Sequence, residues 1–167
     1  EVRPGITVLA NNDAVQHNSR HQKPMNISGQ TFIRGLYCHA VSKVVVRLPG
    51  PGKTFSAVIG VDTNEQTSGG RGSVVFSVNV GGVEKYRSDV LREGMPGVLV
   101  SVDLGGAREF TLHVGDAGDG ISCDQSDWAD AKAVLENGDT VWLGDLPVVG
   151  KPREYSTEPP FSFVYDG

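Results

Sequence analysis

The chain has 167 residues, of which 38% are hydrophobic and 7% aromatic, and this length predicts a single domain. No apolar run approaches the roughly 18 residues of a membrane-spanning helix, which argues against a membrane protein. The formal net charge of -5, without a block of Lys or Arg, argues against nucleic-acid binding, because nucleic-acid binders present a basic face. The chain starts with Glu1 and not with Met, and we interpret it as a mature or excised part of a longer protein.

Several segments alternate hydrophobic and other residues with a period of two. The clearest of them, in chain order, are residues 55–61, 74–80, 98–104 and 110–114. Successive side chains of a strand point to opposite faces, so each segment offers one apolar face to a core. Gly81-Gly82 separates two such runs and predicts a two-residue hairpin turn. The pattern predicts an all-β fold, a β-sandwich or jelly roll of about eight or nine antiparallel strands.

The two parts of the chain differ in composition. Residues 1–146 make up the predicted sandwich, whereas residues 147–167 contain four prolines and a short apolar run near the end. Such a segment is typical of a linker or of the start of a following catalytic module. The alternative is a C-terminal arm that packs on its own domain.

Aspartates are concentrated in residues 116–130, which hold five of them. Like charges so close together are unfavourable unless a cation or hydrogen bonds neutralise them. One interpretation is a structural calcium ion bound by Asp116, Asp119 or Asp127 together with backbone carbonyls. The other is that these side chains accept hydrogen bonds from backbone amides in glycine-rich turns, as aspartate commonly does.

Trp128 is one of only two tryptophans, and it follows Asp124, Gln125 and Asp127. An aromatic ring beside carboxylate and amide groups suits a sugar, whose C–H face stacks while its hydroxyls form hydrogen bonds. The alternative is that Trp128 fills the sandwich core. The sequence contains no nucleophile elbow, Walker loop or paired CxxC motif, so catalysis has no support.

Three motifs in order resemble a known family. They are GLYCHAVS at residues 35–42, AVIGVD at 57–62 with GSVVF at 72–76, and the aspartate-rich segment 116–130. Together they resemble the NPCBM family, carbohydrate-binding module family 51, over roughly residues 5–146. The resemblance implies a β-sandwich appended to secreted bacterial glycoside hydrolases that often binds galactose-containing glycans.

The resemblance also implies where the ligand binds, because it places His39 and the segment 124–128 together on the ligand side. The carbohydrate-binding residues that it implies are His39, Asp62, Asp124, Gln125 and Trp128. Gln125 stands where the family usually has His, so a hydrogen-bond donor and acceptor are kept but the imidazole is lost.

The two cysteines lie in or beside these motifs. Cys38 belongs to the first motif and Cys123 to the third. If the two motifs are neighbours in the fold, a Cys38–Cys123 disulfide can form; the alternative is two reduced, buried thiols.

These observations lead to a functional hypothesis. We expect a non-catalytic module that targets an attached secreted glycoside hydrolase to galactose-type glycans. Its partners would be a glycan and a downstream catalytic module of the same parent chain, in a secreted, periplasmic or cell-surface location. One alternative is a structural accessory domain that packs on the catalytic module and binds no sugar. Another is a free-standing β-sandwich glycosidase or lyase.

Overall fold

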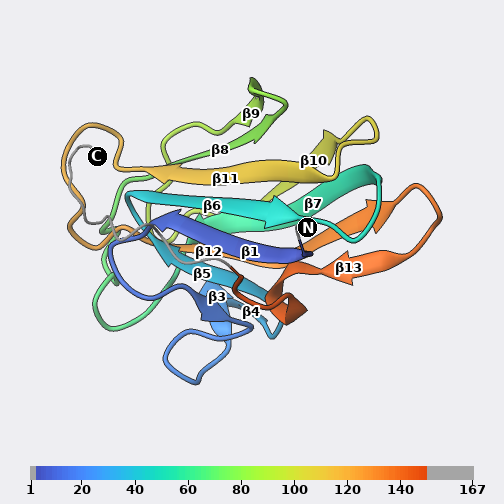
Figure 1. Ribbon diagram of the computed structural model, residues 1–167. Coiled ribbons are helices and arrows are strands. Elements are labelled where there is room, and N and C mark those ends of the chain that lie inside the picture. The colour runs from blue at the N-terminus through green and yellow to red at the C-terminus, as the bar shows by residue number, and fades with distance from the viewer. Residues whose placement is uncertain (1–2, 150–167) are drawn as a thin grey trace.

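The computed structural model describes residues 3–149, which form two antiparallel sheets packed face to face (Figure 1). Sheet A has the strand order β1 (Gly5–Ala10), β6 (Ser42–Arg47), β11 (Glu109–Gly115), β8 (Val75–Val80), β9 (Val83–Arg87). Sheet B has the order β10 (Val98–Asp103), β7 (Gly52–Val61), β12 (Gln125–Leu135), β5 (Gly35–His39), β2 (Gln16–His17), and β13 (Thr140–Trp142) also pairs with β12. The prediction of an all-β sandwich is confirmed.

The core lies between the two sheets, where the apolar faces of the alternating strands meet. Four aromatic side chains, Phe55, Phe76, Phe110 and Trp128, are its largest members, and all are essentially inaccessible to solvent. The rings of Phe76 and Trp128 meet edge to face with centroids 5.0 Å apart, an arrangement that aromatic pairs prefer. Burial of this face on every long strand holds the two sheets together.

Strand β12 contains a β-bulge that changes which of its residues face the core. Its register with β7 shifts between Ala129 and Lys132, and Asp130 has a positive φ of 49°. Before the bulge Trp128 points into the core, and after it Ala131 and Ala133 do. The extra residue reverses the alternation of faces. Even-numbered residues of β12 therefore face the core before the bulge, and odd-numbered residues face it after the bulge.

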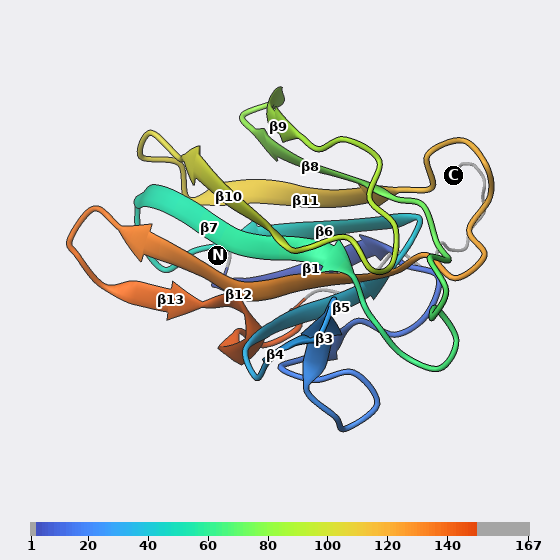
Figure 2. The same cartoon turned by 180° about the vertical axis from the view of Figure 1, so that it is seen from behind.

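Apart from the β8–β9 hairpin, successive long strands alternate between the sheets, so most of their connections collect at the two ends of the sandwich (Figures 1 and 2). Strands β5, β7 and β11 end where β6, β8 and β12 begin. We call this end the loop end. It gathers residues 40–41, 62–74 and 116–124, which are far apart in the sequence, beside the polar segment that precedes β3.

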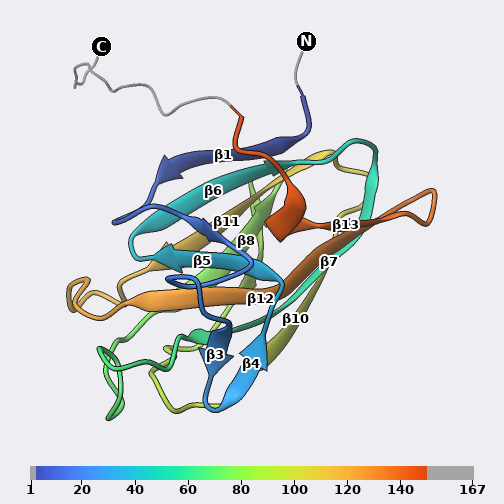
Figure 3. The ribbon, with the colours of Figure 1, turned by 90° about the horizontal axis from the view of Figure 1, so that it is seen from below.

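A small hairpin covers part of the outer face of sheet B (Figure 3). Its strands are β3 (Met25–Ile27) and β4 (Gln30–Phe32), and its apolar side chains pack on Ala129 of β12. A Cβ atom at Gly60 would lie 2.5 Å from Cγ2 of Ile27, so glycine is required for the hairpin to approach β7 this closely.

The strand count differs from the prediction because β2, β3, β4 and β13 have only two or three residues each. Such short strands carry no visible alternation, and thirteen are present in the described residues. A short 3-10 helix, η1 (Leu143–Asp145), follows β13. Val148 then bridges Ile6 of β1, and the rest of the predicted linker, residues 150–167, lies outside the described residues. Over residues 3–149 we find no helix with the length and apolar character needed to span a membrane.

Candidate functional site

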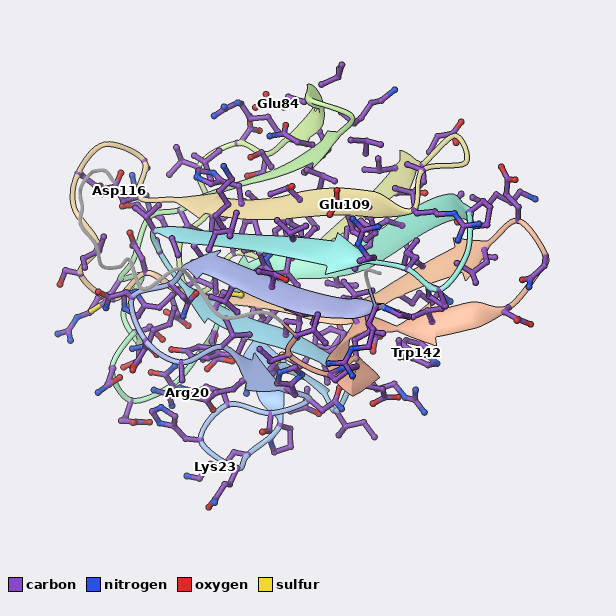
Figure 4. All side chains as sticks on the ribbon, in the orientation of Figure 1. Arg20, Lys23, Glu84, Glu109, Asp116 and Trp142 are labelled. Atoms are coloured by element: carbon purple, nitrogen blue, oxygen red, sulfur yellow. The ribbon has the colours of Figure 1, made fainter. Side chains whose placement is uncertain are left out.

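A polar hollow of about 280 Å³ lies at the loop end, between the segment before β3 and the loop that follows β7. Its charged and amide side chains are those of Arg20, Lys23, Asn26, Asp62, Asn64 and Glu65. Figure 4 shows Arg20 and Lys23 together on this side of the molecule. We call this hollow the polar pocket.

Arg20 forms the back of the polar pocket and is almost completely buried. Its Nη2 atom donates hydrogen bonds to Oε1 of Gln125 at 3.0 Å and to Oε1 of Gln66 at 3.1 Å. Nε2 of Gln125 donates in turn to the same oxygen of Gln66 at 2.7 Å. The guanidinium is therefore held by two amide side chains, one from β12 and one from the loop after β7.

Asp62 is the acceptor at the centre of the polar pocket. Its Oδ1 accepts the backbone N–H of Asn26 in β3 at 3.0 Å, and its Oδ2 accepts Nδ2 of Asn64 at 2.7 Å. Nδ2 of Asn64 also donates to Oε1 of Gln125 at 2.8 Å. Because each partner comes from a different part of the fold, the side chains that line the pocket are fixed before any ligand arrives.

A second carboxyl group, that of Asp127, lies beneath Asp62 and is fully buried in β12. Neither of its oxygens meets an N–H or O–H donor within residues 3–149, and its neighbour is the carboxyl of Asp62. Burial and the adjacent carboxyl of Asp62 raise the pKa of Asp127 well above its usual value. Its burial beside a second carboxyl therefore favours the neutral form of Asp127.

Tyr37 pairs with Asp127 across β5 and β12 and completes the buried layer under the polar pocket. Burial raises the pKa of its phenol to about 12, so it stays neutral. The guanidinium carbon of Arg20 lies 6.0 Å from the centre of the Tyr37 ring. The arrangement presents an ammonium, carboxylates and amides to the solvent side. Such groups bind hydroxyl-rich neutral ligands, and no nucleophile and base are brought together here for catalysis.

Comparisons with known proteins agree with this architecture. The family model of the NPCBM/NEW2 domain matches residues 5–134. The chain belongs to the NPCBM/NEW2 domain family. It is a non-catalytic carbohydrate-binding module of the kind that is joined to glycoside hydrolases.

Three proteins illustrate the relationship of this NPCBM/NEW2 domain to others. A Renibacterium salmoninarum protein named as an endo-alpha-N-acetylgalactosaminidase is 34% identical over 109 residues, which are 65% of this chain and 7% of that protein. The CBM51-2 and INT domains of Clostridium perfringens ZmpB, solved in complex with GlcNAc, are 28% identical with a TM-score of 0.66, covering 77% of this chain and 28% of that one. A CBM51 from Clostridium perfringens GH95, solved with methyl-galactose, is 23% identical with a TM-score of 0.68, covering 76% and 92%. The domain thus spans a small part of the first relative's length.

The fold brings together the two motif segments that were expected to be neighbours. Gln125 pairs directly with His39 across β12 and β5, and Asp62 follows β7 on the other side of β12. Of these predicted residues, only Asp62 lines the polar pocket; Gln125 lies behind it. The His39 ring donates from Nδ1 to the carbonyl of Ala40 at 2.9 Å and does not line the polar pocket.

Asp124 is also placed away from the polar pocket; it is buried and directly precedes β12. Its Oδ1 accepts the backbone N–H of Ser73 at 2.8 Å, which ties the loop after β7 to the start of β12. Its other oxygen is buried without a partner in the described part of the chain. Burial raises the pKa of Asp124 to about 6, against the opposing effect of the Ser73 bond. Its position indicates a structural role in the loop end.

The prediction of Trp128 as a stacking platform is wrong. The side chain is 0% exposed and packs between Phe55 and Phe76 in the centre of the sandwich. The alternation of faces along β12 puts Asp127 outward and Trp128 inward, so the two cannot share one ligand surface. The alternative interpretation, that Trp128 fills the core, is the one that the structure supports.

The three aspartates considered for calcium do not come together. Asp127 is buried beside Asp62, while Asp116 and Asp119 lie in the loop between β11 and β12. Within residues 3–149, no three His, Cys, Asp or Glu side chains are grouped closely enough to hold one metal ion. Asp116 accepts the N–H of Gly118, and Asp119 accepts the hydroxyl of Ser73, as turn aspartates do.

The predicted Cys38–Cys123 disulfide is wrong, because both thiols are free. Cys38 points into the core from β5 and pairs with Ser126, three residues beyond Cys123. The Cys123 thiol faces the other way and donates to the carbonyl of Gln66 at 3.4 Å. The motifs are neighbours, as expected, but the Cys38 side chain lies in the core and that of Cys123 in the loop before β12.

Sequence reasoning missed Arg20, Asn64 and Gln66, which belong to segments without clear periodicity. The sequence did offer one signal. Asp62 directly follows a strand, and a carboxylate that is buried at such a position needs hydrogen-bond donors around it. Which loop residues supply those donors depends on long-range packing, since Arg20 and Gln125 are 105 positions apart.

Proposed function

We propose that the polar pocket binds the terminal sugar of a galactose-type glycan. The observation that carries the proposal is the fixed set of donors and acceptors around Asp62. Asp62 and Asn64 are oriented by the buried network, and the exposed Lys23 and Glu65 stand at the rim. Preorganised polar groups lose little side-chain freedom on binding, which favours a small hydroxyl-rich ligand.

The choice of galactose-type sugars follows from their hydroxyl geometry. Galactose and N-acetylgalactosamine carry an axial 4-hydroxyl beside an equatorial 3-hydroxyl, so that one carboxylate or ammonium group can contact both. Glu65 and Lys23 offer one group of each kind at the rim of the same hollow. The name of the Renibacterium relative, an enzyme that acts on N-acetylgalactosamine, supports the same class.

Calorimetric titration with pairs of epimers tests this proposal. We expect methyl β-galactoside and methyl α-N-acetylgalactosaminide to bind at least about tenfold more tightly than methyl β-glucoside, whose 4-hydroxyl is equatorial. Lys23→Ala should weaken galactoside binding, and the matched variant Lys53→Ala, which changes an exposed lysine at the far end of β7, should not. Equal binding of the glucoside, or an unchanged affinity of Lys23→Ala, contradicts the assignment. No binding of any glycan favours the accessory domain without sugar binding.

We propose further that the module belongs to a secreted parent and tethers a downstream glycoside hydrolase module to its glycan. Binding of this kind raises the local concentration of the enzyme at its substrate even when a single site is weak. Removal of the module from the full-length parent should slow hydrolysis of an immobilised glycan and leave hydrolysis of a small soluble glycoside unchanged. Equal loss on both substrates contradicts a targeting role.

A structural calcium ion at the β11–β12 loop is a separate proposal. Asp116 or Asp119 would supply a carboxylate, and backbone carbonyls of the same glycine-rich loop would supply the other oxygen ligands. Melting curves recorded with added calcium and with a chelator test it. An increase in Tm with calcium supports the site, and identical curves contradict it.

A further inference from the structure

A second hollow, of about 440 Å³, lies at the loop end between the β7–β8 loop and the β11–β12 loop. Its volume is within the range of pockets that take small ligands. It adjoins the polar pocket at Gln66, whose side chain accepts a hydrogen bond from Arg20 and whose carbonyl accepts one from Arg71. Figure 4 shows Asp116, where the β11–β12 loop begins, at the same end of the molecule as Arg20. We call this hollow the arginine pocket, and the side chains that line it are Arg71, Ser73, Arg92, Asp119, Ser122 and Cys123.

Two of the lining residues, Ser73 and Arg92, are placed on one side by the backbone pairing beneath them. Val74 bridges Leu91, and the side chains of both belong to the core. Neighbouring side chains of paired extended segments point to opposite faces, so Ser73 and Arg92 point together away from the core. The next backbone hydrogen bond, which the carbonyl of Arg71 accepts at 3.1 Å, holds the second arginine beside the first.

Both arginines of the arginine pocket are exposed, and neither has an ion-pair partner within residues 3–149. Arg71 donates from Nη1 to the carbonyl of Gln66 at 3.4 Å, which is a long hydrogen bond to a neutral group. By contrast, four other arginines do pair with a carboxylate, namely Arg20, Arg34, Arg47 and Arg87. The side chains that line the pocket thus carry two positive charges against the single negative charge of Asp119, in a chain whose net charge is -5.

The carboxylates in and around the arginine pocket accept hydrogen bonds from other groups. Asp119 accepts the hydroxyl of Ser73, and the buried Asp124 accepts the N–H of the same residue at 2.8 Å. Glu93 uses its two oxygens on two donors of the β7–β8 loop, each at 2.9 Å. None of these carboxylates forms an ion pair with either arginine of the pocket, so both guanidiniums are available to an anion from solution.

The chemistry of these side chains indicates the class of ligand. A guanidinium binds a carboxylate or a sulfate through two parallel N–H···O hydrogen bonds, which a neutral sugar cannot accept in the same way. The hydroxyl of Ser122 and the exposed carboxylate of Asp119 can exchange hydrogen bonds with sugar hydroxyls. The polar pocket differs, because its Arg20 is buried and bonded to two amide side chains.

We infer that the arginine pocket binds an acidic sugar. Its carboxylate or sulfate group lies against Arg71 and Arg92, and its hydroxyls contact Asp119 and Ser122. The carboxylate of Asp119 repels the acid group, so the sugar is oriented with that group towards the two arginines. This site goes beyond the galactose-type site proposed for the polar pocket and does not depend on it.

Pairs of sugars that differ only in the acid group test this inference by titration at low salt with a chelator present. Methyl β-glucuronide and methyl β-glucoside 6-sulfate are each compared with methyl β-glucoside, and methyl α-N-acetylneuraminide with its methyl ester. We expect at least one acidic sugar to bind about fivefold or more tightly than its neutral counterpart. The probe with the larger preference distinguishes a carboxylate from a sulfate. The preference should shrink when NaCl is raised from about 20 to 500 mM, because salt screens exposed charges.

Two results of these titrations would overturn the inference. One is the absence of a preference for any acidic sugar over its neutral counterpart. The other is binding of inorganic sulfate as tight as that of the best acidic sugar, because the pocket would then take an ion and not a sugar.

Variants separate this site from the polar pocket and from a general effect of charge. Arg71→Ala and Arg92→Ala change exposed residues and should each weaken the acidic sugar by about threefold or more without lowering Tm. Arg108→Ala is the matched control, because it removes the same charge from an exposed position in the β10–β11 connection, at the other end of the sandwich. Lys23→Ala should weaken galactosides and not acidic sugars, so failure of the proposed function leaves this test intact. Acidic-sugar binding that survives in both Arg71→Ala and Arg92→Ala, or that is lost in Arg108→Ala or Lys23→Ala, would overturn the site.

Discussion

The two faces of β12 show how one strand serves the core and the site at once. Trp128 and Asp127 are adjacent and both are 0% exposed, yet their surroundings are opposite. Trp128 packs against Phe76 between the sheets, whereas Asp127 lies under the polar pocket beside Asp62. Burial alone therefore does not indicate an apolar environment. The inner face holds the sandwich together, and the outer face holds the pocket in shape.

The inner face should be the more sensitive of the two to truncation. Trp128→Ala removes the largest buried side chain and leaves a cavity that the rigid sheets cannot close. We expect a loss of about 3–5 kcal/mol in the free energy of unfolding. Urea denaturation followed by circular dichroism measures it. A loss below about 1 kcal/mol would contradict the core position, and Trp128→Phe should cost clearly less than the alanine variant.

The outer face is expected to tolerate an isosteric change but not a truncation. Asp127→Ala removes a fully buried side chain beneath the polar pocket and leaves a cavity, which should cost about 1–3 kcal/mol in the free energy of unfolding. Asp127→Asn keeps the size of the side chain and cannot ionise, so it should be much less harmful. The same urea denaturation, run on both variants, measures the difference. Equal losses in the two variants would contradict a contribution from filling this buried position.

The pH dependence at the start of β12 gives a smaller effect. The pKa of Asp124 is about 6 in the folded chain and lies at the ordinary value of 3.8 when the chain is unfolded. The folded state therefore binds more protons between these pH values, so this group's contribution to stability falls as the pH rises from about 4 to 6. Asp124→Asn cannot titrate, and its Tm should gain on the wild type over that interval and then stay level. A difference in Tm that does not change with pH would contradict the raised pKa.

The fold was predictable from the period of two in the sequence, because each long strand buries one face. In segments such as 55–61 and 110–114 the hydrophobic residues of the alternating pattern are the buried ones. The short strands and the hairpin β3–β4 were not, since three residues cannot show a period. The bulge at Asp130 was equally hidden. It reverses the alternation within β12, so Trp128 and Ala131 both face inward although their spacing is odd.

The site was predictable only as a region. Motifs that are distant in the sequence, ending in His39 and Asp62, do converge on the start of β12. The side chains that reach the pocket could not be predicted. The direction of each side chain depends on which face of the strand its residue occupies and on the loop that covers that face. Arg20 illustrates the limit: its partners Gln66 and Gln125 are set by packing between loops, and no local pattern encodes that contact.

The smallest expected effect concerns the cysteines, one of which is buried in the core and the other partly exposed in a loop. Because both thiols are free, excess dithiothreitol should leave Tm unchanged, whereas loss of a bridge over this loop would cost about 4–5 kcal/mol. Thiol labelling of the denatured, unreduced protein should detect both cysteines. Burial raises the pKa of Cys38 to about 12, so it should stay unlabelled in the native state. Cys123→Ser, at a partly exposed loop position, should change stability by no more than about 0.5 kcal/mol.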